Sequence, residues 1–201
     1  MSRRTSSPEV SPKMPLGRRI VVFGPPASGK STLCRELSAI LGLPLIHVDA
    51  LRFLEQPQPP VRLAERLRSL VGSHQEGWIS DGAGPRQGSP LLEDCDTVIQ
   101  LKLPLRVIAW RAGVRRAQRL LGRDPHWPLR EPLSRSFGRN SFLYWLAVRR
   151  GRNSRSPLDL LGTTGKAERL IVLSRPAHVA RFLAEVRQAA EPASRPPPPA
   201  R

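Results

Sequence analysis

Residues 24–31, with the sequence GPPASGKS, have the types and the spacing that bind the phosphates of a nucleoside triphosphate. They match the P-loop (Walker A) pattern G-x-x-x-x-G-K-[ST] at each specified position. In such a loop the glycines let backbone N–H groups approach a phosphate closely, and the lysine supplies a positive charge. The hydroxyl suits Mg²⁺, a hard cation that prefers oxygen ligands. The sequence therefore predicts binding of ATP with Mg²⁺, with a preference over GTP left open.

The positions within and just after the loop have separate expected roles. We expect Lys30 to neutralise charge on the β- and γ-phosphates, Ser31 to bind Mg²⁺ and Thr32 to contact the α-phosphate. An apolar run precedes the loop and a helix follows, whose positive dipole end would point at the phosphates. The predicted nucleotide-binding residues are Gly24, Pro25, Pro26, Ala27, Ser28, Gly29, Lys30, Ser31 and Thr32.

Two aspartates follow apolar runs at places where a parallel sheet would bind its ligand. Asp49 follows the second predicted strand and Asp81 the third. Each could hold Mg²⁺ through a water or accept a proton from an attacking hydroxyl, and the alternative for each is a helix cap or a turn residue. We assign Asp81, together with Ser31, to the metal, and Asp49 to catalysis and to the phosphoryl acceptor.

The stretch after Asp81 predicts an acceptor site. Gly82 would let the backbone approach a substrate, and Arg86 could clamp a phosphate, although a flexible loop with a solvated arginine is the alternative. His47 lies within the second predicted strand and is interpreted as a buried, hydrogen-bonded histidine. The tryptophans, Trp110 among them, are interpreted as packing residues.

Apolar runs and helical periodicity alternate along the chain between these residues. Strands that alternate with helices of this length predict an α/β, doubly wound parallel sheet with right-handed crossovers. The strands are expected at residues 19–23, 44–48, 78–80, 97–103 and 170–173, and the helices at 29–41, 61–71, 105–121, 137–149, 157–161 and 177–190.

The positive charge of the chain is concentrated in one segment. The net charge is +17, and residues 102–155 hold 14 Lys and Arg but only two acidic residues. Arg111, Arg115 and Arg119 are spaced four residues apart, so they share one helix face and repel one another. This face could close over triphosphate oxygens as a lid, be solvated, or bind nucleic acid.

The two ends of the 201-residue chain differ from its middle. Residues 1–18, rich in Ser, Pro and Arg, predict a disordered leader, and the Pro-rich residues 191–201 a disordered tail, which leaves one domain at 19–190. No run approaches the roughly 18 apolar residues of a membrane span, and Cys34 and Cys95 do not have metal-site spacing. We expect a cytoplasmic protein without membrane partners, and the oligomeric state stays open.

The sequence resembles the small P-loop nucleotide-kinase-like ATPases known as adenylate-kinase-related or DNA topology modulation proteins. The resemblance covers most of residues 19–187 and rests on the P-loop, 43–51 (LPLIHVDAL), 78–82 (WISDG), 96–99 (DTVI) with 103–105 (LPL), and the basic run 149–160. It implies the strand order 2-3-1-4-5, a magnesium-linked Asp81-Gly82 and lid arginines at Arg111 and Arg115. The family commonly has Asn-Tyr where this chain has Ala83-Gly84, and neither activity on AMP nor any particular substrate is implied.

Three hypotheses about function follow. The first is a kinase that transfers the γ-phosphoryl group of ATP to a small acceptor, either a nucleotide or a hydroxylated metabolite as in shikimate-type kinases. The second is a nucleotide-dependent regulator or nucleic-acid-associated ATPase that uses residues 102–155, and the third is a non-catalytic nucleotide-binding module. For the kinase, the predicted catalytic residues are Lys30, Asp81, Asp49, Arg111 and Arg115.

Overall fold

A five-stranded, all-parallel β-sheet organises the chain. The computed structural model describes residues 16–53, 60–83, 89–121 and 170–190. The sheet has the order β2-β3-β1-β4-β5, so the α/β class and the strand order are confirmed. Its elements are β1 (Arg19–Phe23), α1 (Lys30–Leu41), β2 (Leu45–Ile46), α2 (Val48–Phe53), α3 (Pro60–Ser73), β3 (Trp78–Ser80), α4 (Pro90–Asp94), β4 (Thr97–Leu101), α5 (Leu105–Leu120), β5 (Leu170–Leu173) and α9 (Pro176–Ala190).

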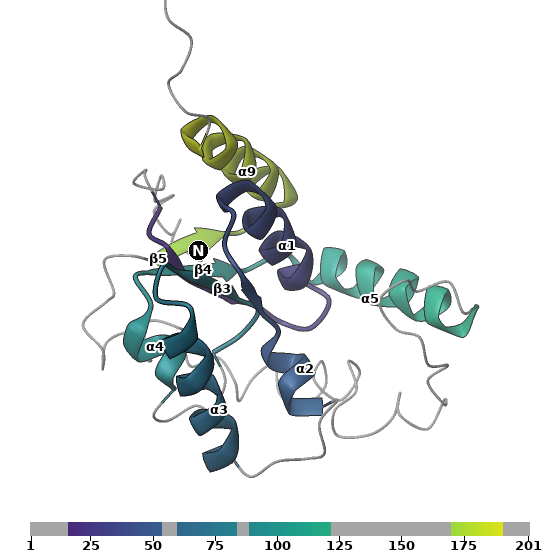
Figure 1. Ribbon diagram of the computed structural model, residues 1–201. Helices are drawn as coiled ribbons and strands as arrows, with labels where there is room; N and C mark the ends of the chain where they lie inside the picture. The colour runs from purple at the N-terminus through teal and green to yellow at the C-terminus, as the bar shows by residue number, and fades with distance from the viewer. Residues whose placement is uncertain (1–15, 54–59, 84–88, 122–169, 191–201) are drawn as a thin grey trace, which may run out of the picture.

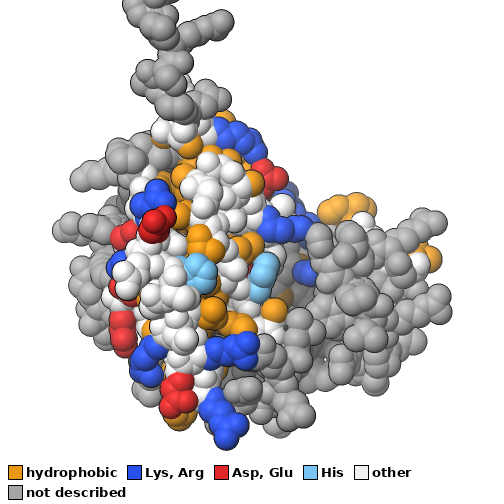
Figure 2. All heavy atoms as spheres, viewed as in Figure 1, with side chains coloured by type: hydrophobic (Ala, Val, Ile, Leu, Met, Phe, Trp, Pro, Cys, Tyr) orange, Lys and Arg blue, Asp and Glu red, His pale blue; other side chains and the backbone are white. Residues whose placement is uncertain are grey.

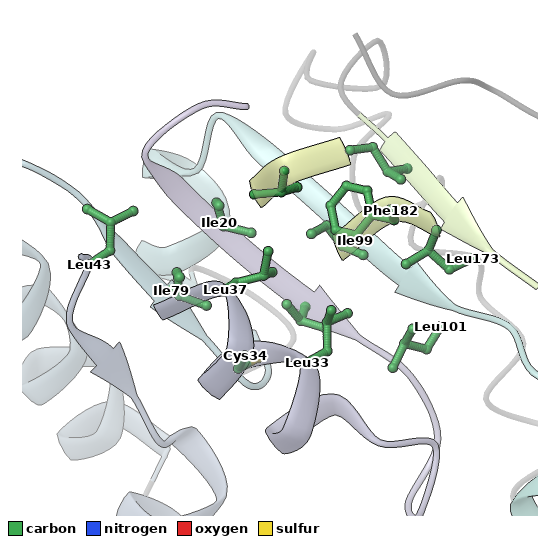
Figure 3. Close-up of a cluster of buried hydrophobic side chains, with 13 residues drawn as sticks. Ile20, Leu33, Cys34, Leu37, Leu43, Ile79, Ile99, Leu101, Leu173 and Phe182 are labelled. Atoms are coloured by element: carbon green, nitrogen blue, oxygen red, sulfur yellow. The ribbon is translucent and has the colours of Figure 1, made fainter. Parts of the chain in front are cut away.

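Helices cover both faces of the sheet and give the molecule three layers. In Figure 1, α1 and α9 lie together on one face, and α3 and α4 lie on the other. The first face carries a buried cluster in which Ile20 and Ile99 of the sheet point toward Leu33 and Leu37 of α1 and toward Phe182 of α9 (Figure 3). The residues between these on the strands belong to a second cluster under α3 and α4.

The central strand shows why the sequence forms this arrangement. Ile20 and Val22 join the cluster on the α1 face, whereas Val21 joins the cluster on the α3 face. Side chains alternate between the two faces of a strand, and both faces of this sheet are covered by helices. A continuous β-branched run is therefore required at this position.

Most element boundaries agree with the sequence to within two residues. β1, β3 and β5 have the predicted bounds, and α1 ends before Gly42, whose left-handed φ of 65° closes the helix. The second strand was predicted too long, because it ends at Ile46 and the chain turns into the short helix α2, which was not predicted. The five-residue α4 was also missed.

Several predictions lie outside the described residues. They are residues 1–15 of the leader, the Pro-rich tail, Arg86, the helices at 137–149 and 157–161, and most of the basic segment. The predicted leader was too long, because residues 16–18 are described and the Arg18 N–H donates to the Asp96 carboxylate at 2.8 Å. Among the residues that are described, no helix is long and apolar enough to cross a membrane. Trp78 is fully buried as expected, but the packing role predicted for Trp110 is wrong, because 74% of this residue is exposed on α5.

Phe182 ties α9 to the sheet and is 1% exposed. Phe182→Ala leaves a cavity in a close-packed layer, so we expect it to lower the free energy of unfolding by about 3–5 kcal/mol. Urea denaturation followed by circular dichroism measures this loss. Val61→Ala is the matched control, because Val61 is 67% exposed and its truncation should change stability by less than about 0.5 kcal/mol. Equal losses in both variants would contradict the assigned packing.

Candidate active site

The carboxyl ends of three adjacent strands bring the candidate residues together. The sheet order places β3 between β2 and β1. His47 follows β2, Asp81 follows β3, and Gly24 opens the loop after β1. Since the strands are parallel, these three residues lie at one edge of the sheet, where ligands of open α/β sheets bind. The P-loop and the predicted carboxylate are therefore neighbours in space.

The P-loop has a tightly turned backbone. The Ser28 N–H donates to the Pro25 carbonyl at 3.2 Å, and the Lys30 Nζ donates to the same oxygen at 3.2 Å. Ala27 and Gly29 have left-handed φ angles of 61° and 96°. For Ala27 this conformation costs about 1–2 kcal/mol. The strand and helix on either side hold the loop in this strained shape, as is common at functional sites.

Two features of the loop fit the phosphates of a nucleotide. A Cβ added at Gly24 would lie 2.7 Å from Ser28 Oγ and 3.2 Å from the Leu101 carbonyl oxygen, so only glycine is accommodated. Ser28 is 1% exposed, and its buried hydroxyl has no hydrogen-bond partner in the described part of the chain. A buried polar group without a partner is costly, and a ligand oxygen is one way to satisfy it. The predicted phosphate loop thus has the geometry and the chemistry for an anionic ligand.

The Asp81 carboxylate joins the loop to the neighbouring strand. It is 4% exposed. Its Oδ1 accepts the N–H of Val48 at 2.9 Å, and its Oδ2 lies 3.1 Å from His47 Nδ1 and 3.4 Å from the Ser31 hydroxyl oxygen. The structure therefore brings together Ser31 and Asp81, the two predicted metal ligands. The described residues hold no cluster of three or more His, Cys, Asp or Glu, so hydroxyl and phosphate oxygens would have to complete a metal site here.

The predicted acceptor residues lie around the same carboxylate or outside the described part. Gly82 directly follows Asp81 and has a φ of 156°, and its carbonyl accepts the Ser80 hydroxyl at 2.8 Å. Asp49 is the second residue of α2, beside the Val48 N–H that Asp81 binds. Arg86 lies beyond the described residues. The acceptor roles of these residues stay predictions.

His47 differs from its expected state in two respects. It lies after β2 rather than within it, and its side chain is 48% exposed rather than buried. The expected hydrogen bond is present, and its partner is Asp81. Sequence reasoning gave His47 no functional role. The available signal was that His47 is the first polar residue after the apolar pair Leu45 and Ile46, as Asp81 follows the run that ends β3.

Helix α5 brings one predicted lid arginine to the P-loop. Arg111 Nη1 donates to the Ser28 carbonyl at 2.8 Å, and a Cβ on Gly29 would lie 2.9 Å from the same nitrogen. The helix therefore places this basic residue against the predicted phosphate site. Arg115 lies one turn further along α5 and is exposed. The catalytic roles of both arginines stay predictions.

Cys34 lies beneath the site on α1. Its Sγ is 3.7 Å from the Ser80 carbonyl oxygen, and the residue is fully buried. Burial raises the pKa of the Cys34 thiol far above its usual range, the Asp81 carboxylate raises it further, and Lys30 offsets part of the change. The thiol is therefore neutral at physiological pH and is a packing group rather than a nucleophile.

The sequence is similar to that of a known kinase. No family model matches the sequence. A shikimate kinase from Rhodococcus jostii is 34% identical, and the match covers 53% of this chain and 73% of the relative. Among solved structures, a shikimate kinase from Bacteroides thetaiotaomicron is 14% identical with a TM-score of 0.47, covering 86% of this chain and 98% of the other. A sugar kinase from Janibacter is 18% identical with a TM-score of 0.44, covering 88% and 98%.

The similarity to the Rhodococcus enzyme identifies the family of this chain. At 34% identity over 73% of its length, that relative shares its family with this chain. The P-loop sequence and the parallel sheet of order 2-3-1-4-5 are consistent with this membership. The chain therefore belongs to the family of P-loop kinases that includes this shikimate kinase.

Proposed function

We propose that the protein is an ATP-dependent phosphotransferase whose acceptor is a hydroxyl group of a small metabolite. The observation that carries the proposal is the Asp81 carboxylate, which contacts Ser31 on the nucleotide side and His47 and Val48 on the other. Such a group can orient an acceptor hydroxyl toward a γ-phosphate held by the loop. Kinship with a shikimate kinase favours a hydroxylated metabolite over a nucleotide as the acceptor.

On the nucleotide side, the residues act by binding and by neutralising charge. The loop around Gly24 and Ser28 would cradle the β-phosphate, and Lys30 would turn from the Pro25 carbonyl toward the β- and γ-phosphates. Ser31 and Asp81 would hold Mg²⁺, which would neutralise charge on the transferred group when bound. Because phosphoryl transfer has a loose transition state, positioning and electrostatics account for most of the catalysis.

On the acceptor side, two carboxylates and a glycine form the proposed site. Asp81 and Asp49 are the candidates to accept the proton of the attacking hydroxyl, and Gly82 leaves room for the acceptor beside Val48. Arg86 is proposed to clamp an anionic group of the acceptor. The identity of the acceptor is the part of the proposal that an assay has to supply.

The basic helix α5 would supply positive charge to the triphosphate. Arg111 already touches the Ser28 carbonyl, so a small side-chain movement would bring its guanidinium to a phosphate oxygen. Arginine suits this role because its fork can bind two oxygens at once. We propose that Arg115, one turn further along the same helix, contributes in the same way.

Gly24→Ala tests the phosphate cradle. The added Cβ would meet the Leu101 backbone and the Ser28 hydroxyl, so we expect the loop to distort and ATP affinity to fall at least about tenfold. Isothermal titration calorimetry with Mg·ATP measures the affinity. Gly72→Ala on α3 is the matched control, because a Cβ there meets no atom within 4 Å. Unchanged affinity in Gly24→Ala would contradict the proposed phosphate site.

Asp81→Asn tests the carboxylate while keeping an acceptor oxygen for the Val48 N–H. Loss of the charge should weaken the use of Mg²⁺, and we expect kcat/KM to fall by about 10–100-fold with a higher Mg²⁺ requirement. Steady-state ATP turnover across a Mg²⁺ series measures both effects. Asp94→Asn is the control, because Asp94 pairs with Arg19 at the amino end of the sheet. If Asp81→Asn matches Asp94→Asn, the carboxylate has no part in turnover.

An acceptor panel tests the proposed reaction itself. ATP turnover with Mg²⁺ is measured with shikimate, sugars, sugar acids, nucleoside monophosphates and DNA, and products are identified by ³¹P NMR. We expect one hydroxylated metabolite to become phosphorylated, and Lys30→Ala to lower its kcat/KM by more than about 100-fold. If only a nucleoside monophosphate becomes phosphorylated, the acceptor is a nucleotide and not a hydroxylated metabolite. Stimulation by DNA alone would replace the kinase proposal with the nucleic-acid-associated ATPase.

A further inference from the structure

His47 contacts the central carboxylate of the site through one ring nitrogen. Its Nδ1 lies 3.1 Å from Asp81 Oδ2, the same oxygen that is 3.4 Å from the Ser31 hydroxyl. An ionised carboxylate can only accept hydrogen bonds, so Nδ1 must carry the proton in this contact. A neutral imidazole that carries its proton on Nδ1 has Nε2 as a hydrogen-bond acceptor.

The rest of the ring reaches the surface at the carboxyl edge of the sheet. The His47 side chain is 48% exposed, whereas the Asp81 side chain that it contacts is only 5% exposed. Figure 2 shows pale-blue histidine side chains exposed on the visible face, with lysine and arginine side chains both close to them and further out. His47 directly precedes Val48, where α2 begins and whose N–H is bound by the other oxygen of Asp81. Both oxygens of the carboxylate are thus engaged by consecutive residues of the β2–α2 turn.

We propose that His47 is a positioning residue that couples acceptor binding to the Asp81 carboxylate. Through Nδ1–H it holds Oδ2 in the orientation that faces Ser31, and through Nε2 it accepts a hydrogen bond from a hydroxyl of the acceptor. An acceptor that engages Nε2 thereby orders the Asp81 carboxylate beside Ser31. The acceptor half of this inference rests on the proposed function, whereas the Nδ1 half rests on the contact alone.

A simpler role would be purely structural, with the His47 contact only helping to hold the turn between β2 and α2. That role would lower the free energy of unfolding in every variant that lacks the ring. It would not distinguish variants that keep one of the two nitrogen positions, nor would it change the Mg²⁺ requirement. Asn places an amide N–H near the position of Nδ1, and Gln places an amide near the position of Nε2, so the two variants separate the two contacts.

The first test reads the ring itself and needs no enzymatic activity. Long-range ¹H–¹⁵N NMR of the full chain with Mg·ADP reports which nitrogen of His47 carries the proton. We expect the Nδ1–H tautomer, converted by Asp81→Asn to a mixture of tautomers. An Nε2–H tautomer in the wild-type protein would overturn the proposal, because Nδ1 could then not donate to the carboxylate.

The second test uses His47→Asn, His47→Gln and His47→Ala in ATP turnover, first with water as the acceptor and then with shikimate as the probe. The Mg²⁺ concentration for half-maximal turnover should rise about tenfold in His47→Gln and His47→Ala but stay near wild type in His47→Asn. The KM for a phosphorylated acceptor should rise about tenfold in His47→Asn and His47→Ala, with a smaller change in His47→Gln. The KM for ATP should stay unchanged in all three variants.

His74→Asn is the matched control. His74 bonds the Leu70 carbonyl at 2.7 Å before the start of β3, at the opposite edge of the sheet. Identical Mg²⁺ dependence in all the His47 variants and the wild type would overturn the Nδ1 role. If shikimate and the rest of the panel are not phosphorylated, the proposed acceptor reaction fails and the Nε2 role fails with it, while the Mg²⁺ series still decides the Nδ1 role.

Discussion

The buried carboxylate of Asp81 is the constraint on which the arrangement of the site depends. Burying an ionised group is costly unless hydrogen bonds replace its lost hydration. The backbone N–H of Val48 and the ring of His47 provide such bonds, and the hydroxyl of Ser31 lies nearby. Val48 and His47 lie in the turn between β2 and α2, and Ser31 lies in the first turn of α1. The carboxylate therefore links the turn after β2 to the start of α1, beside the phosphate loop.

The sheet order makes these contacts possible. With β3 between β2 and β1, a residue just after β3 reaches the turns that follow both neighbours. The two buried clusters pack these strands against α1 on one face and α3 on the other, so close-packed side chains support the strands that carry the site. A close-packed frame also supports the left-handed backbone at Ala27, which would not persist in an isolated loop.

Helix α5 adds the third side of the site. Sequence spacing indicated only that its arginines share a face, and left open whether that face meets solvent, nucleic acid or a nucleotide. The bond from Arg111 to the Ser28 carbonyl sets this residue against the phosphate loop. This contact supports the role proposed for Arg111, which is to neutralise charge on the transferred group.

The sequence by itself determined the phosphate loop, the parallel sheet and the placement of Asp81, because each is encoded by a local pattern: fixed glycine and lysine spacing, β-branched runs, and an aspartate after a strand. Only the tertiary structure decided the ends of β2 and α2 and the state of His47. The N–H at the start of α2 is satisfied by a carboxylate 33 residues away, so no local pattern marks that helix. His47 was expected to be buried because it falls within the predicted strand 44–48. The strand instead ends at Ile46, so His47 lies in the turn beyond the helix-covered sheet, and its side chain is 48% exposed.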